Sequence, residues 1–214
     1  MPTEEQTHLI EQVAISFQQI GTHWPPIYKE FYINWGYFNR IYDTLYAEGN
    51  RYEWQRIAFF ALEHQHLWQW LDDLAEPLVS IPCVGVSTGD SEPEEHIRVA
   101  TFTLRNELGI DPTQICNIND PKCSQRRIRC VDFEFSKAPN RIDNTNPKHA
   151  QHTPLGAALT IIYQIRNNLF HGGKFEFNGP EMERNLKLVA RSNRFILELL
   201  RQYFRSLNNN QAPD

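Results

Sequence analysis

The chain has 214 residues, of which 41% are hydrophobic and 12% aromatic, and its formal net charge is −5. This length fits one domain with its own core, and this composition excludes a disordered chain. No apolar run reaches the roughly 18 residues that a membrane-spanning helix needs, and the acidic start lacks the basic and apolar regions of a signal peptide. We therefore expect a cytoplasmic protein with a single domain over residues 1–214 and no membrane partner.

Apolar residues spaced three or four apart predict four helices in the first half of the chain, because this spacing places them on one helical face. The expected helices cover residues 4–20, 27–48, 52–76 and about 94–108. The second helix carries a stripe of large side chains, Phe31, Trp35, Phe38, Tyr42 and Leu45. This spacing is typical of a surface packed in the core or between subunits, more than of a platform for stacking bases.

Two segments between the helices lack a helical period. Residues 77–93 contain three prolines and two glycines and predict a loop. Residues 110–153 are rich in Asn, Asp, Pro, Lys and Arg, so we expect a long irregular insertion there. Apolar residues alternate with acidic ones in residues 131–135 and 175–177, which favours two short strands and a small β-ribbon.

The insertion also holds a basic cluster and three cysteines. Arg126, Arg127 and Arg129 are candidates for contact with RNA phosphates, although a solvated charged surface has the same pattern. The cysteines, Cys116, Cys123 and Cys130, are spaced more widely than the paired cysteines of zinc sites. We expect packed thiols and no metal, with a zinc site that adds His149 as the alternative.

Residues 155–171 predict a helix with an apolar stripe, formed by Leu155, Ala158, Ile162, Ile165 and Leu169. Gly172 and Gly173 would end it. Its last turns carry Arg166, Asn167 and His171. Arginine has a permanent planar charge that matches phosphate oxygens, and histidine exchanges protons near neutral pH. The three residues are therefore candidates for phosphate chemistry, although the helix dipole alone also favours Arg and His at this end.

Helix geometry limits which of these side chains can converge. At about 100° per residue, Asn167 and His171 are about 40° apart and share a face, whereas Arg166 and His171 are about 140° apart. Three arrangements would bring Arg166 and His171 together. The helix could distort before the glycines, the arginine could reach around the helix, or a second subunit could supply the same segment.

A basic last helix follows. Pro180 and Glu181 favour a helix start, and the helix should continue to about residue 206 before a frayed polar tail, 208–214. Residues 111–214 hold 15 Lys/Arg and 10 Asp/Glu, whereas residues 1–110 hold 6 and 16. This local positive charge would attract a polyanion despite the negative total, and ordinary variation in surface charge is the alternative explanation.

The run from Arg166 to His171, Arg-Asn-Asn-Leu-Phe-His, resembles the Arg-x4–6-His signature of the HEPN superfamily, with the polar residue that the family prefers after the arginine. The resemblance implies an all-α bundle of about five to six helices. It also implies a homodimer, because the site in that family usually forms where two subunits bring their motifs together. Gly173 stands where members paired with a nucleotidyltransferase antitoxin have a tyrosine, so control through that tyrosine is not implied.

The resemblance further implies a metal-independent endoribonuclease without a cofactor, in a toxin–antitoxin or phage-defence setting. The ribose 2′-OH would attack the adjacent phosphorus, with His171 as general base or acid. Arg166 would hold the phosphate, and Asn167 would orient His171 or donate to phosphate. Lys174 would add a cationic contact. The expected partners are RNA, a second copy of the chain and an antitoxin or another defence-system protein.

A non-catalytic module is the alternative. The same surface would then bind a nucleotide or RNA without cleaving it, or would serve as a dimerisation element of a larger complex. The effect of His171→Ala separates the two, because only an enzyme has turnover to lose.

Overall fold

The structure is a computed structural model, and it describes residues 25–49, 51–80, 95–111, 139, 141–171 and 180–209. Across these ranges it contains six α-helices, two 3₁₀ helices and no strand, so the prediction of an all-α bundle is confirmed. Within the same ranges, no helix combines the length and the apolar character needed to cross a membrane. The predicted first helix, 4–20, and the predicted β-ribbon, 131–135 with 175–177, lie outside the described residues.

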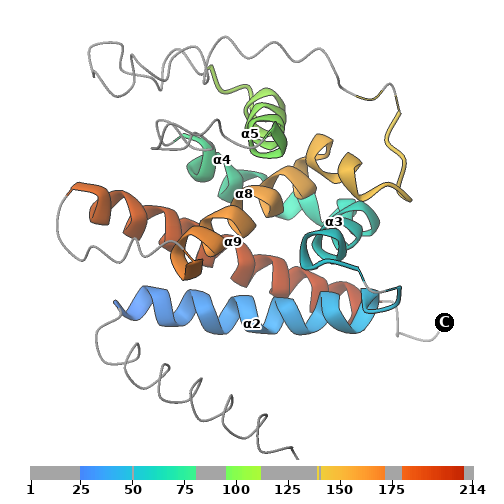
Figure 1. Ribbon diagram of the computed structural model, residues 1–214, viewed down its shortest axis with the longest axis horizontal. Coiled ribbons are helices and arrows are strands. Elements are labelled where there is room, and N and C mark those ends of the chain that lie inside the picture. The colour runs from blue at the N-terminus through green and yellow to red at the C-terminus, as the bar shows by residue number, and fades with distance from the viewer. Residues whose placement is uncertain are drawn as a thin grey trace, which may run out of the picture.

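The helices surround α8, which lies at the centre of the molecule (Figure 1). In chain order they are α2 (Pro26–Tyr46), α3 (Glu53–Glu63), η1 (Gln65–Trp70), α4 (Asp72–Val79), α5 (Glu95–Glu107), η2 (Pro147–His152), α8 (Pro154–His171) and α9 (Pro180–Asn209). Figure 1 shows α2 and α9 side by side along one side of the bundle, and α5 packed on α8 at the other. Buried side chains from all six α-helices and η1 form one continuous core.

The aromatic stripe of α2 belongs to this core, as the spacing of its residues predicts. Phe31, Trp35, Phe38 and Tyr42 are buried, but Leu45 is 46% exposed and Tyr46 is buried in its place. Leu45 and Tyr46 flank the stripe at similar angles on an ideal helix. The neighbouring helix decides between them, because the Tyr46 ring stacks on Phe59 of α3 with 6.3 Å between centroids.

The single helix predicted over 52–76 is wrong, because the chain forms α3, η1 and α4 there. The first break follows from a tertiary contact. The Gln65 side-chain amide donates to the Ala61 carbonyl at 2.6 Å and to the Thr153 hydroxyl at 2.7 Å. A continuing α-helix would instead bond the Ala61 carbonyl to the Gln65 main-chain N–H.

The predicted end of this segment at Pro77 is also wrong, since α4 continues to Val79. Leu78 and Val79 are buried, and the Pro77 carbonyl accepts a hydrogen bond from Arg191 of α9. These tertiary contacts hold the last turn beyond a residue that usually ends a helix.

The predictions for the remaining described helices are confirmed within three residues: α5 against 94–108, α8 against 155–171 and α9 against an end near 206. Phe102 of α5 is 38% exposed. The segment 110–153, predicted to be irregular, contains η2 near its end. This short helix packs against α3, α5 and α8, and it positions part of the site described below.

Candidate functional site

The candidate residues lie where α8 leaves the core. The first half of α8 is largely apolar and is buried at Leu155, Ala157, Ala158, Leu159, Ile161 and Ile162. From Tyr163 to Asn167 the helix is half-buried, and Ile165 and Leu169 still pack against the core. The predicted apolar stripe is therefore confirmed. It anchors the helix, while the polar residues that follow it gain access to solvent.

Close backbone and hydroxyl contacts hold the start of α8 against η2, and we call this contact region the junction. The Thr153 hydroxyl donates to the Ala150 carbonyl at 2.8 Å and accepts from the Gly156 N–H at 3.3 Å. A Cβ on Gly156 would lie 2.0 Å from the Ala150 carbonyl oxygen, so only glycine fits this approach. The junction therefore fixes η2 beside the polar face of α8.

Arg166 is held in a network between α2, α3 and α8. Its Nη1 lies 3.3 Å from Glu53 Oε2 and donates to Asn167 Oδ1 at 2.8 Å. The side chains of Arg166 and Glu53 are 23% and 24% exposed. The guanidinium carbon also lies 6.0 Å from the centroid of the Trp35 ring, within cation–π range. The arginine is thus oriented by contacts from three helices.

Tyr42 anchors the other oxygen of Glu53. Its hydroxyl donates to Glu53 Oε1 at 2.7 Å. Burial raises the pKa of Tyr42 well above its usual range, and the hydrogen bond to Glu53 raises it further. Tyr42 therefore stays protonated and acts as a donor that fixes the carboxylate facing Arg166.

The structure brings Arg166 and Asn167 together, as their adjacency allows, but it does not distort α8 toward His171. The helix is α-helical through His171, so the backbone positions of Arg166 and His171 stay about 140° apart. The His171 side chain lies outside the described part of the chain. So do Lys174, the basic cluster Arg126, Arg127 and Arg129, and the cysteines Cys116, Cys123 and Cys130.

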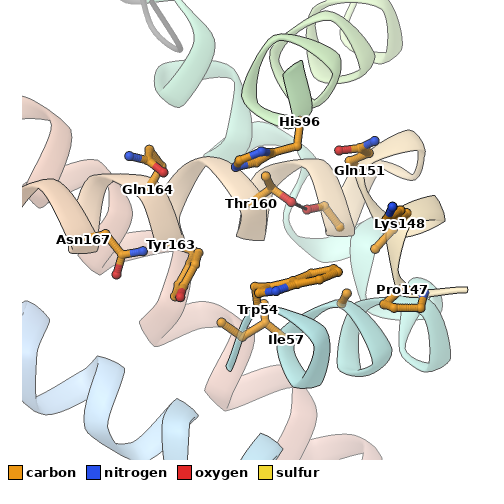
Figure 2. A pocket seen from close by; sticks show the side chains of 13 residues that line it. Trp54, Ile57, His96, Pro147, Lys148, Gln151, Thr160, Tyr163, Gln164 and Asn167 are labelled. Atoms are coloured by element: carbon orange, nitrogen blue, oxygen red, sulfur yellow. Dashed lines mark hydrogen bonds between the residues drawn. The ribbon is translucent and has the colours of Figure 1, made fainter. Parts of the chain in front are cut away.

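A pocket of about 620 Å³ opens beside Asn167. Its walls come from α3, α5, η2 and α8 (Figure 2). Its apolar lining includes Trp54, Ile57, Ala58, Pro147 and Ala150. Its polar lining includes His96, Lys148, Gln151, Thr160, Gln164 and Asn167, together with the Tyr163 ring. The volume and the mixture of apolar walls with a few polar groups are typical of small-molecule sites.

The pocket has two distinct ends. Figure 2 shows Asn167 and Tyr163 toward one end and Lys148 and Pro147 toward the other, with the Trp54 ring between them. Trp54 is 38% exposed, and its side chain lines this opening.

One face of α8 connects the pocket to the motif. Thr160, Gln164 and Asn167 line the pocket at steps of four and three residues, and a further step of four reaches position 171. Asn167 therefore belongs to both the pocket and the Arg166 network. The backbone position of His171 follows it on the same face.

Sequence reasoning missed Glu53 and Trp35 as partners of Arg166, and Tyr42 as the partner of Glu53. Glu53 is 113 residues away from Arg166 in the chain, and no local pattern links the two. The pocket was missed for the same reason, since η2 lies in a segment without a helical period. In the sequence, Trp54 directly follows Glu53 near the start of a predicted helix, and this was the only local pattern that could have pointed to the pocket.

Comparisons with known proteins give no match: no family model, no curated protein and no solved structure is significantly similar to the chain. Within the described ranges, no group of three or more His, Cys, Asp or Glu side chains is arranged to hold a metal ion.

Proposed function

We propose that the protein is a metal-independent endoribonuclease of the HEPN type, acting as a homodimer in a cytoplasmic toxin–antitoxin or phage-defence setting. One observation carries this proposal. Arg166 contacts Asn167 at the end of a pocket of about 620 Å³, on the helix that ends at His171. A fixed cation, an amide and an imidazole on one helix end are the groups that phosphate transfer to a ribose hydroxyl needs.

In the proposed reaction, the ribose 2′-oxygen attacks the adjacent phosphorus and the bond from phosphorus to the 5′-oxygen breaks. The products are a 2′,3′-cyclic phosphate and a 5′-hydroxyl end. His171 takes the proton from the 2′-OH or gives one to the leaving oxygen. Arg166 stabilises the charge that grows on the phosphate oxygens. Its contacts with Glu53 and Asn167 orient the guanidinium before substrate arrives.

Two subunits supply the site in this proposal. Within one straight α8, Arg166 points toward Glu53 of α3, whereas the face of Asn167 leads along the pocket to position 171. A two-fold dimer would place the Arg166 of one copy near the His171 of the other, since such interfaces pair each patch with itself.

The test is cleavage of an RNA and of its all-deoxy analogue in EDTA. We expect the RNA alone to be cut, because the 2′-OH is the nucleophile. His171→Ala and Arg166→Ala should each lower the rate by about 10²-fold or more. Arg194→Ala is the matched control, since Arg194 is exposed on α9 away from the pocket. Cleavage of DNA, or cleavage that survives His171→Ala, would contradict the proposal.

A second candidate is a module that binds RNA or a nucleotide without cleaving it. The ion pair between Arg166 and Glu53 favours it, because a guanidinium already paired with a carboxylate stabilises less of the charge that develops on the phosphate in the transition state. RNA binding without turnover in the unmodified protein would support this candidate over the nuclease.

A further inference from the structure

We infer that the pocket between α3, η2 and α8 is a binding site for one unpaired nucleotide of single-stranded RNA, with its base stacked on Trp54. This inference deepens the proposed function, on which its choice of RNA rests. It assigns a substrate-recognition role to Trp54 and Lys148, two residues outside the Arg166–His171 motif.

Trp54 provides the stacking surface. Of the exposed large aromatic residues in the described part of the chain, Trp54, which is 38% exposed, is the one that lines this pocket. Figure 2 shows the ring lying across the pocket between α3 and Thr160 of α8. Stacking of a base on such a ring is tolerant of sequence, because every base has a π-face.

Amide side chains surround this surface. Gln151 of η2 and Gln164 and Asn167 of α8 line the pocket. An amide carries both a donor and an acceptor, as the edges of the bases do. The pocket walls beside the ring therefore match a flat heterocycle with a polar edge better than they match a purely apolar ligand.

The charge of the lining favours an anionic ligand. No Asp or Glu of the described chain lines the pocket, although the protein as a whole is acidic. Lys148 is exposed at the end away from Asn167, and its ammonium forms no ion pair with any described residue. A free lysine is a point charge suited to a phosphate.

The two ends then fit two successive phosphates of a chain. Lys148 lies toward one end and Asn167, bonded to Arg166, toward the other. A base held at Trp54 between them has a phosphate on each side only if it lies within a polynucleotide. Its phosphate at the Asn167 end would face the motif on the same surface of α8.

The experiment measures binding of a fluorescein-labelled RNA decamer by anisotropy in EDTA, on a His171→Ala background that prevents cleavage. We expect Trp54→Ala to weaken binding by roughly 5- to 150-fold, the range that stacking of one base on one aromatic side chain provides. Trp54→Phe, which keeps a ring, should retain most of the affinity. Trp70→Ala is the matched control, because Trp70 is 46% exposed on η1 and does not line the pocket.

The same titrations at several salt concentrations test Lys148. Lys148→Ala should weaken binding and lower the slope of log K against log salt by about one, as expected for one phosphate contact. Lys29→Ala controls for the loss of an exposed lysine on α2 outside the pocket. If circular dichroism shows that Trp54→Ala is unfolded, the RNA affinities of Trp54→Phe and Lys148→Ala still test whether the pocket binds RNA.

Three results would overturn the inference. The first is that the protein does not bind RNA. The second is that the folded variants Trp54→Ala and Trp70→Ala bind RNA with equal affinity. The third is that AMP displaces the decamer as effectively as unlabelled RNA does, which would assign the pocket to a free nucleotide. The nuclease proposal fails separately. If RNA binding depends on Trp54 but the unmodified protein does not cleave RNA, the pocket assignment stands and the nuclease proposal is rejected. If the protein cleaves RNA at a rate that does not depend on Trp54, the nuclease proposal stands and the pocket assignment is rejected.

Discussion

Arg166 shows how partners from distant parts of the chain orient one side chain. Its guanidinium is oriented by Glu53 and Asn167, and Glu53 is held in turn by the Tyr42 hydroxyl. Because the Arg166 and Glu53 side chains are about three-quarters buried, water screens their charges less than it screens a surface pair. The same contacts that stabilise the fold would also fix the cation for phosphate binding.

Glu53→Gln should lower the free energy of unfolding by about 1–2 kcal/mol, because it leaves a partly buried guanidinium without its carboxylate. Urea denaturation followed by circular dichroism measures the change. Glu183→Gln is the control, since Glu183 pairs with Lys187 on the exposed side of α9, and the loss there should stay within about 0.5 kcal/mol. Equal losses of unfolding free energy in the two variants would show that the Arg166–Glu53 pair stabilises the fold no more than an exposed pair does.

At the scale of elements, the site depends on how η2 docks on α8. Thr153 links the two through its hydroxyl, and Gly156 allows the Ala150 carbonyl to approach the helix. The Gln65 side chain joins the same junction from η1 and interrupts the helix predicted over 52–76. The break in that helix and the wall of the pocket therefore have a common cause.

Gly156→Ala should destabilise the protein by about 1–3 kcal/mol, because the new Cβ would meet a backbone carbonyl that cannot move without displacing η2. Urea denaturation again measures the effect. Gly36→Ala is the matched control on α2, where a Cβ meets nothing within 4 Å. It should raise the free energy of unfolding by about 0.5–1 kcal/mol, as alanine does inside a helix. A neutral Gly156→Ala variant would mean that η2 is not held at this distance.

At the scale of the whole molecule, the proposed function assigns the site to two copies of the chain. A continuous α8 keeps the backbone positions of Arg166 and His171 about 140° apart. In the proposed function, a second copy of the chain would bring the two groups together without bending the helix. It is also the arrangement that the resemblance to the HEPN superfamily implies.

Mixing the inactive variants Arg166→Ala and His171→Ala should restore about a quarter of the unmodified activity, since half of the dimers would be mixed and each would hold one intact site of two. The measurement is the initial rate of RNA cleavage after the subunits have exchanged. A preparation with each variant alone gives the baseline. No recovery, despite exchange shown by mixed dimers in native mass spectrometry, would place the whole site in one chain.

Much of the fold could be predicted because helix formation is largely a local matter. The spacing of apolar residues located α2, α5 and α8, and the glycines after His171 marked the end of the motif helix. The choice between Leu45 and Tyr46 could not be predicted, since both flank the stripe of α2 and only the position of α3 separates them.

The amino-acid sequence by itself determined which segments form α2, α5, α8 and α9, and it placed Arg166, Asn167 and His171 at the end of α8. It did not predict η2, the breaks near Gln65 and Leu71, or the end of α4 at Val79. Only the tertiary structure decided that Glu53 faces Arg166 and that Trp54 and Lys148 open a pocket beside Asn167. The reason is physical: helical periodicity depends on neighbours within a few residues, whereas an ion pair or a pocket depends on which distant surfaces the core brings into contact.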